Sequence, residues 1–389
     1  MQNKEKMITV PPKILFINQS TGYLTIDLVN TFAASGKYEK IALIAGTISE
    51  KSRLNPQVKI SHIKPYKKKT LLQRKMSWII GTIQSLFLVL FKYRKYHLFL
   101  ISNPPVISFV TLFCRNSYST LIYDLYPAGL VVSGLISKKS IINKIWNKFN
   151  RRFFRKAANV FTITEGMAEE IKTCSPNAKL TVIPIWHDIL KDIPKDKQAN
   201  NFVKQNKLHN KFIVMYSGNM GKEYNLETLI YVADELKSDN EIIFIFIGEG
   251  WKKRTITELI TKMNLENCKV LPYQPVEMLS HSLTASDISV VCAPSGIAKT
   301  CLPSKTYTII SLGITILGIA ENNSEISQFI EKNEIGVCFS KEKIKEIAAF
   351  ISELKNDTAQ KTKYKNNSLK IASNYSPQNA QKFINIMNN

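Results

Sequence analysis

Apolar and polar positions alternate in a regular rhythm along the first part of the chain. Residues 13–18 form a short apolar run that is typical of a buried strand, and residues 23–34 then carry apolar side chains at helical spacing. Gly36 stands where such a helix would end, and residues 40–45 form the next apolar run. A strand, a helix and a strand in this order predict a βαβ unit and therefore a parallel sheet.

The same rhythm returns in the second half of the chain. Residues 212–216 predict a strand, residues 226–236 a helix, and residues 242–247 a very apolar strand. Further runs typical of strands lie at residues 98–101, 120–122, 268–271, 289–292 and 315–319. The pattern therefore predicts two α/β domains.

The length of 389 residues suits two domains. A polar stretch that contains Pro194 has the composition of a linker, and Ser376 with Pro377 is expected to start the last helix. We expect a first domain at residues 1–188, a linker at 189–208, a second domain at 209–365 and a C-terminal helical segment at 366–389.

Composition adds a strong charge imbalance. The chain has 53 Lys and Arg against 30 Asp and Glu, a formal net charge of +23. Such an excess indicates an anionic partner, which could be nucleic acid, phospholipid headgroups or a phosphorylated substrate. Because the chain has no zinc-finger spacing, no RNP-like motif and no basic region beside heptads, we do not expect a nucleic-acid partner.

Cysteine and histidine spacing gives no sign of a metal or cofactor. The six cysteines lie far apart without a C-x-x-C pair, and the five histidines show no ligand spacing, so no metal site is expected. Reduced cysteines fit a cytosolic chain, and the short apolar run at residues 14–17 is typical of a strand rather than a signal peptide. We therefore expect a cytoplasmic protein.

One apolar segment, residues 78–91, raises the question of a membrane. It is shorter than the roughly 20 residues that a spanning helix needs. A second stretch, residues 138–156, places Ile, Trp and Phe between many cations. Both segments suit either buried helices with charged ends or helices that lie in the interface of an anionic membrane. The candidate membrane-surface cations are Lys67, Lys68, Lys69, Arg74, Lys75, Lys92, Arg94 and Lys95.

Residues 217–222 form the first candidate binding site. Gly218 and Gly221 allow backbone amides to approach an anion closely, and Lys222 adds a full positive charge before a predicted helix. The spacing matches neither a P-loop nor a dinucleotide fingerprint. The turn suits a diphosphate, but an ordinary strand-to-helix turn would also need its glycines.

Two further candidates follow the same logic. Ser304 is expected to cap a helix that has Lys305 in its first turn, where an anion would relieve an unfavourable helix dipole; a tolerated surface lysine is the alternative. Asp124 follows the strand at residues 120–122, where it would either hydrogen-bond a ligand hydroxyl or cap a turn.

The order of several short motifs resembles the retaining GT-B glycosyltransferases of family 4, in the branch of the colanic-acid and L-fucosamine transferases of bacterial polysaccharide assembly. The resemblance runs over nearly the whole chain. Its motifs lie at residues 102–105, 123–127, 164–167, 183–188, 216–221, 247–250, 271–275 and 302–305.

The resemblance implies two Rossmann-like domains that face a cleft, with a C-terminal helix that crosses back to the first domain. The second domain would bind a nucleotide-sugar and the first an acceptor. The implied donor-binding residues are Gly218, Asn219, Lys222, Tyr273, Gln274, Gly296, Ser304, Lys305 and Thr308. The implied acceptor-side residues are Gly22, Asn103 and Asp124, with Asp124 and Lys222 as the catalytic pair.

The chain departs from the family pattern at four positions. Thr300 and Thr308 stand where many members have glutamates, Tyr123 stands for a histidine and Ala128 for a glutamate. The resemblance still implies a hexosyltransferase-type enzyme without a cofactor, peripheral on the inner membrane. It would move a sugar, with retention, from a nucleotide-sugar to a lipid-diphosphate-linked saccharide in O-antigen, capsule or exopolysaccharide synthesis. A catalytically impaired partner subunit and a nucleotide-sugar epimerase are the alternatives.

Overall fold

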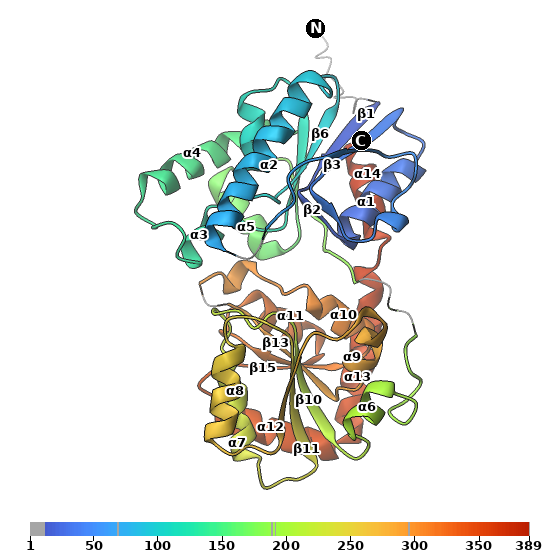
Figure 1. Ribbon diagram of the computed structural model, residues 1–389, viewed down its shortest axis with the longest axis vertical. Helices are drawn as coiled ribbons and strands as arrows, with labels where there is room; N and C mark the ends of the chain where they lie inside the picture. Colours follow the sequence, from blue (N-terminus) through green and yellow to red (C-terminus); the bar gives the residue numbers. More distant parts are fainter. Residues whose placement is uncertain (1–11, 68–69, 188–189, 191, 295, 389) are drawn as a thin grey trace. The chain divides into compact units, whose positions relative to one another are not determined.

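The computed structural model describes residues 12–67, 70–187, 190, 192–294 and 296–388 (Figure 1). The chain divides into two compact units. Unit 1 comprises Met1–Ile185 and Pro377–Asn389, and unit 2 comprises Trp186–Ser376. Each unit is a parallel α/β structure, as the sequence predicts.

Unit 1 is built on a seven-stranded parallel sheet with the order β5-β3-β1-β6-β7-β8-β9. Its strands are β1 (Lys13–Ile17), β3 (Lys40–Ala45), β5 (Lys59–His62), β6 (His97–Ile101), β7 (Tyr118–Ile122), β8 (Val160–Thr162) and β9 (Leu180–Val182). A separate pair joins β2 (Ser20–Thr21) to β4 (Thr47–Ile48). β1, β6 and β7 are almost fully buried. Ile14–Ile17 and Leu98–Ile101 are therefore continuous apolar runs, whereas β7 also buries Ser119 and Thr120.

One face of this sheet packs against α1 (Tyr23–Ala34) and α14 (Asn379–Met387), which lie side by side in Figure 1. The core on this face is a cluster of phenylalanines: Phe16, Phe32, Phe99, Phe161 and Phe383. The ring centroids of Phe161 and Phe383 are 4.7 Å apart. The last helix of the chain is therefore part of the core of unit 1.

The other helices of unit 1 include two with strongly basic flanks or faces. They are α2 (Leu71–Phe91), α3 (Ala128–Val132), α4 (Ile141–Lys156) and α5 (Glu165–Cys174), with 3-10 turns at Lys51–Arg53 and Ile107–Leu112. Figure 1 shows α2 and α4 on the side of the unit away from α1 and α14. The buried Gln19 side chain anchors α2, because its Nε2 donates to the carbonyl of Ser77 at 2.7 Å.

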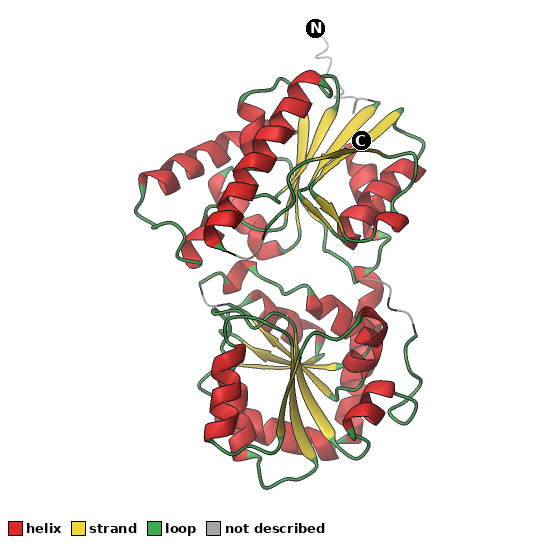
Figure 2. Ribbon diagram, in the orientation of Figure 1, coloured by secondary structure: helices red, strands yellow, loops and turns green. Residues whose placement is uncertain are grey.

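Unit 2 has a six-stranded parallel sheet with the order β12-β11-β10-β13-β14-β15. Its strands are β10 (Phe212–Ser217), β11 (Ile242–Ile247), β12 (Cys268–Leu271), β13 (Ile288–Cys292), β14 (Thr315–Ile319) and β15 (Gly336–Phe339). Its helices are α6 (Asn201–Asn206), α7 (Glu227–Glu235), α8 (Lys253–Lys262), α9 (Leu279–Thr284), α10 (Lys305–Ser311), α11 (Glu325–Asn333), α12 (Ile344–Asn356) and α13 (Thr358–Ala372). In Figure 2 helices flank both faces of this sheet.

Alternate residues of the central strands of unit 2 fill two separate cores. Val214 and Phe244 pack with α7, α8 and α12, whereas Ile213 and Met215 pack with α6 and with the residues that flank α9, Met278 and Ala285. This period of two, with both faces covered, explains the unbroken apolar sequence of β10 and β11.

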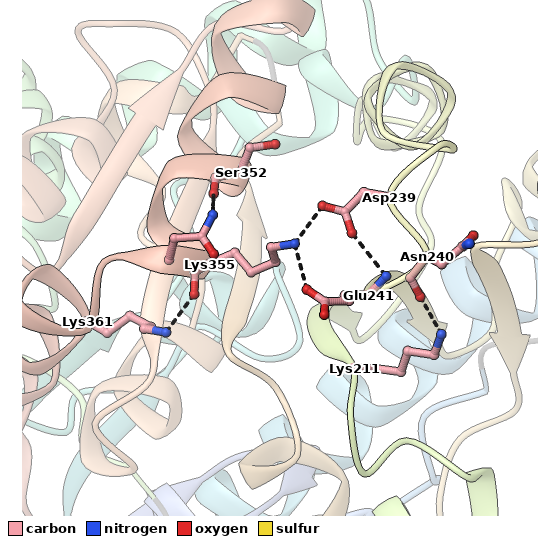
Figure 3. A network of polar contacts seen from close by, with 8 residues as sticks. Lys211, Asp239, Asn240, Glu241, Ser352, Lys355 and Lys361 are labelled. Atoms are coloured by element: carbon pink, nitrogen blue, oxygen red, sulfur yellow. Dashed lines mark hydrogen bonds and ion pairs between the residues drawn. The ribbon is translucent and has the colours of Figure 1, made fainter.

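A polar network ties the corner between α12 and α13 to the amino end of β11 (Figure 3). The Lys355 ammonium donates to Asp239 at 2.7 Å and to Glu241 at 2.8 Å, and Lys361 donates to the carbonyl of Lys355 at 2.9 Å. The hydrogen bond from Lys355 lowers the pKa of the Asp239 carboxyl. These ion pairs lie at the amino edge of the sheet, so the carboxyl edge is left for the candidate site.

The segment expected to be a linker, residues 189–208, contains a helix. Asn200 caps α6 by accepting from the amides of Phe202 and Val203, and both of these side chains are fully buried in a core of unit 2. The burial of two apolar side chains holds this helix in unit 2. Because the residues around them are polar, the apolar pattern of the sequence did not predict it. Residues 188, 189 and 191 lie outside the described part of the chain.

The C-terminal segment also differs from the expected boundary. α13 continues to Ala372 within unit 2, so residue 366 lies inside that helix. The final helix, α14, begins at Asn379, close to the Ser376 and Pro377 start signal. Only the last helix therefore returns to unit 1, and the division between the units falls at residue 185 rather than at residue 188.

Candidate functional site

The turn after β10 lies at the carboxyl end of a central strand of unit 2. Gly218 has a φ of +145°, a conformation that side chains rarely adopt, and its amide donates to the carbonyl of Ile247 at 2.9 Å. The Tyr216 hydroxyl donates to the carbonyl of Asn219 at 2.6 Å. The turn is thus held to the neighbouring strand β11, at the edge where open α/β sheets bind ligands.

The structure brings Lys305 to this turn from a helix 83 or more residues further along the chain. Its Nζ lies 3.7 Å from the centroid of the Tyr216 ring and donates weakly, at 3.4 Å, to the carbonyl of Ser217. A side chain on Gly218 would come within 3.9 Å of the same Nζ. The separate motifs around Gly218 and Lys305 therefore form one site.

Lys305 carries a charge that the described residues do not neutralise. Burial lowers the pKa of its ammonium from 10.5 to about 8, and the nearby Cys292 thiol raises it slightly in the opposite direction. No carboxylate of the described chain pairs with it. Instead, the ammonium lies over the electron-rich face of the Tyr216 ring. Lys305 is half-buried, and a partly desolvated cation of this kind is stabilised when an anion binds beside it.

The helix ends near the turn contribute less than the sequence predicts. Ser304 precedes α10, but its side chain makes no capping hydrogen bond, because its backbone is already helical. α7 begins only at Glu227, whose carboxylate lies in the first turn and accepts from Lys252 at 2.7 Å. The positive character of the site therefore depends mainly on Lys305 and Lys222. The expected capping by Ser304 is wrong.

Lys222 lies on the exposed rim of the turn. Its Nζ is 5.5 Å from the centroid of the Trp251 ring. The sequence analysis did not single out Trp251, although the glycines at 248 and 250 before it were a signal of a special backbone at the end of β11.

The remaining donor-side candidates lie at the same edge of the sheet. Tyr273 and Gln274 follow β12, and Gln274 donates to the carbonyl of Pro272 at 2.9 Å. Gly296, with a φ of +88°, follows β13, and Thr308 lies on α10. Tyr273 is close enough to Tyr216 to raise the pKa of its hydroxyl, but among the described residues no hydrogen bond or ion pair joins these four to the turn, so their part in a site stays a prediction.

In unit 1, the acceptor-side candidates also lie after strand ends. The Ser102 hydroxyl accepts from the amides of Tyr123 and Asp124, at 2.9 and 3.3 Å, which joins the ends of β6 and β7. The carbonyl of Asn103 accepts from the amide of Gln19 at 2.9 Å. Gly22 precedes α1 with open space where a side chain would lie.

Asp124 lies at a small cavity of about 30 Å³ that Tyr126, Trp146 and Asn150 also line. The carboxyl keeps access to solvent, but desolvation by the surrounding protein raises its pKa, and a hydrogen bond from Tyr126 partly offsets this. Because the cavity is water-sized, a sugar could meet Asp124 only at the open rim.

The candidate membrane-surface cations surround α2. Arg74 lies over the Trp78 ring at 5.8 Å, and Lys92 donates to the Ser61 hydroxyl at 2.9 Å. Lys68 and Lys69 lie outside the described residues. Lys67, Lys75, Arg94 and Lys95 form no ion pair within the part of the chain that the structure describes.

α2 is longer than the apolar segment at residues 78–91, and one of its faces is open. Six large apolar side chains on it are between 48% and 78% exposed: Leu72, Met76, Ile79, Ile83, Phe87 and Phe91. On α4, Ile141, Ile142 and Ile145 are at least 60% exposed. Across the described helices, none combines the length and the apolar character needed to cross a bilayer.

The described residues also hold no cluster of three or more His, Cys, Asp or Glu side chains with which to bind a metal ion. None of the six cysteines is in a disulfide bond within the part of the chain that the structure describes.

Comparison with known proteins relates unit 2 to a family. Residues 197–371 match the family described as "Glycosyl transferases group 1". The match covers less than half of the chain. It includes the turn at residues 217–222 and Lys305, so both groups of the site lie within the matched domain.

Two curated relatives and one solved structure extend the comparison. The putative colanic acid biosynthesis glycosyl transferase WcaI of Escherichia coli (strain K12) is 28% identical over 232 residues, which are 58% of this chain and 56% of that protein. The probable glycosyltransferase WbjE of Pseudomonas aeruginosa is 25% identical over 221 residues, 56% of this chain and 54% of that protein. The chain thus spans about half the length of the curated relatives it matches.

The structure of HepE from Anabaena in complex with UDP-glucose superposes with a TM-score of 0.70 at 14% identity, covering 96% of this chain and 99% of that one. At this identity the likeness shows the fold. The chain has the GT-B fold, which confirms the expected fold class.

Proposed function

We propose that the protein is a glycosyltransferase that moves a sugar from a nucleotide-sugar to a lipid-diphosphate-linked saccharide during polysaccharide assembly, with retention. The observation that carries the proposal is the Lys305 ammonium, which lies beside the Gly218 turn without a carboxylate partner among the described residues. A diphosphate is an anion of the kind that backbone amides and ammonium groups bind.

The chemistry of sugar transfer accounts for the position of the cations. The bond between the sugar and the diphosphate breaks through an oxocarbenium-like state, while negative charge grows on the departing diphosphate. Lys305, Lys222 and the amides of Gly218 and Asn219 would stabilise that growing charge. The acceptor hydroxyl would then attack the sugar and give up its proton, which we assign to the leaving phosphate on the basis of the family resemblance.

The relatives support a sugar-nucleotide donor and a polysaccharide product. HepE was solved with UDP-glucose, and WcaI is named for colanic acid biosynthesis. We assign the acceptor to unit 1, where Asp124 would orient the attacking hydroxyl at the rim of its cavity. Because desolvation raises its pKa, the Asp124 carboxylate is a stronger acceptor for the proton of a hydroxyl.

We also propose that unit 1 lies on an anionic membrane surface, cytoplasmic side, where a lipid-linked acceptor is found. Between Glu50 and Glu165 the sequence has 21 Lys and Arg residues and a single acid, Asp124. The exposed apolar faces of α2 and α4 lie within this cationic region. Apolar side chains that enter the acyl boundary, flanked by cations that meet lipid phosphates, are the pattern of an interfacial helix.

The donor assignment is tested by thermal melting of the protein with UDP, GDP, ADP and dTDP, followed by transfer from the matching radiolabelled sugar nucleotides. We expect one nucleoside diphosphate to raise the melting midpoint, and Lys222→Ala to lower transfer by at least about 100-fold, which is typical for loss of one group that stabilises a developing charge.

Different failures would have different meanings. Protection by a nucleotide without transfer to any lipid-linked acceptor would favour a catalytically impaired partner subunit, which the threonines at 300 and 308 make the second candidate. Absence of protection by every nucleoside diphosphate would contradict the proposed donor site.

A further inference from the structure

The loop after β11 is pressed directly against the turn after β10. Gly248 and Gly250 both have a φ of +147°. A side chain on Gly248 would lie 1.9 Å from the carbonyl oxygen of Gly218, and one on Gly250 would lie 2.5 Å from that of Met220. Only glycine permits this approach, so the two loops pack backbone against backbone.

Backbone hydrogen bonds fix the two loops on both sides of Trp251. The amide of Met220 donates to the carbonyl of Glu249 at 2.8 Å, and the amide of Lys252 donates to the carbonyl of Met220 at 2.9 Å. Lys252 is 9% exposed and forms an ion pair with Glu227. Trp251 therefore has fixed backbone before and after it.

The Trp251 side chain is nevertheless 65% exposed, which is unusual for a tryptophan whose backbone is so well fixed. Its one described ring contact is with the Lys222 ammonium, at 5.5 Å from the ring centroid. The neighbouring carboxylate of Glu249 does not neutralise Lys222, because it pairs with Lys253 at 2.6 Å. Among described residues the Lys222 ammonium has no ion pair, and the face of the Trp251 ring lies beside it.

We infer that Trp251 is a positioning residue, which holds the Lys222 ammonium at the rim of the Gly218 turn so that it meets the diphosphate of the donor. The inference rests on the proposed function. The indole covers one side of the ammonium, and the N–H groups on the other sides remain for phosphate oxygens. An aromatic face can do this without neutralising the charge, whereas a carboxylate would compete with the phosphate.

Calorimetric titration with UDP and with inorganic pyrophosphate tests this role. Trp251→Leu removes the ring but keeps an apolar side chain, Trp251→Phe keeps a ring, and Lys222→Ala removes the charge. We expect Trp251→Leu to weaken both ligands about two- to fivefold, the value of an exposed cation–π contact. Trp251→Phe should weaken them less.

The double variant, Trp251→Leu with Lys222→Ala, distinguishes a positioning role of Trp251 from a merely structural one. If Trp251 acts through Lys222, Trp251→Leu adds nothing in the Lys222→Ala background. Equal effects in both backgrounds, or weakening of UDP but not of pyrophosphate, would overturn the inference and point to a contact with the nucleobase. If Lys222→Ala leaves both affinities unchanged, the assignment of Lys222 to the donor site fails, and this inference fails with it.

Discussion

Lys305 shows how a single residue can be costly for the fold and useful for binding. Its side chain is half-buried, and its ammonium lies on the Tyr216 ring with no carboxylate partner among the described residues. The charged form is disfavoured, so the pKa falls to about 8. The unfolded chain, with the ordinary pKa of 10.5, holds more protons between these two values. The charged Lys305 side chain therefore lowers the free energy of unfolding by its full amount below pH 8, and this destabilisation is relieved as the pH rises toward 10.5.

Replacement of Lys305 by methionine should separate stability from binding. Lys305→Met keeps an apolar side chain of similar reach and removes the buried charge, so we expect a higher melting midpoint at pH 7. The affinity for the bound nucleoside diphosphate should fall at least about tenfold, the scale of one charge-assisted hydrogen bond. Scanning calorimetry and titration measure the two effects. A lower midpoint together with unchanged affinity would show that Lys305 is a structural residue.

The same pKa predicts a pH dependence of donor binding. A bound diphosphate favours the ammonium form, so binding above pH 8 should be accompanied by proton uptake, and affinity should fall as the pH rises from 8 to 9.5. Titration in two buffers of different ionisation enthalpy measures the protons taken up. In Lys305→Met the uptake should vanish; uptake that persists in this variant would assign it to another group.

At the scale of elements, the site depends on close approach between two strand ends. Gly248, at the end of β11, leaves room for the carbonyl of Gly218 at the end of β10. Substitution there cannot be absorbed by a side-chain movement, because the atom in the way belongs to the backbone. The geometry of the turn is therefore set by its neighbour as much as by its own sequence.

Gly248→Ala should displace the turn and weaken nucleoside diphosphate binding at least about tenfold, through loss of amide and lysine contacts. Gly36→Ala is the matched control, because Gly36 also has a positive φ, of +66°, but open space where the new methyl group would lie. It should bind as the wild type does. Equal affinity of Gly248→Ala and wild type would mean that the approach of the two loops is not needed.

The sequence predicts the long buried strands of this fold, since β11 is apolar throughout and β10 and β14 are apolar except for Ser217 and Thr315. It predicts helices near α1, α2, α4, α7, α10 and α14, but not the other described α-helices. It did not predict the three-residue strands β8 and β9, or β5 and β15, which are too short or too mixed to show a period. α6 was hidden because its burial rests on two residues, Phe202 and Val203. Short elements take their structure from the sheet around them.

The sequence predicts the separate motifs of the site but not the contacts between them. Gly218, Lys222 and Lys305 are visible as local motifs, and the structure brings Gly218 and Lys305 together. The contact of Lys222 with Trp251 depends on the packing of β11 beside β10, which no local spacing reveals. The absent capping bond of Ser304 is likewise a matter of backbone geometry rather than of residue type.

On the scale of the whole molecule, charge and exposed apolar surface concentrate in the same part of the sequence. Between residues 50 and 165 the sequence has 21 Lys and Arg residues and one acid, so this stretch accounts for most of the net charge of +23. Unit 2 instead uses many lysines in ion pairs, as Lys355 does with Asp239 and Glu241 (Figure 3). This asymmetry suits a protein with one membrane-facing unit.

Vesicle flotation tests that asymmetry. The protein should bind vesicles that contain phosphatidylglycerol, bind phosphatidylcholine alone much less, and dissociate as salt rises, because each cation near the surface contributes about 1 kcal/mol. Ile83→Ser with Phe87→Ser should weaken binding, whereas Tyr231→Ser, an exposed aromatic of unit 2, should not. Binding that does not change with salt concentration, lipid charge or the two apolar substitutions would refute a membrane role for α2.

The most direct test of the account is a crystal structure of the protein with the nucleoside diphosphate that protects it in thermal melts. We predict phosphate oxygens within about 3 Å of the Lys305 Nζ and of the amides in the Gly218 turn, at the carboxyl edge of the sheet of unit 2. A nucleotide bound elsewhere, with the Lys305 ammonium still resting on the Tyr216 ring and no anion beside it, would contradict the account.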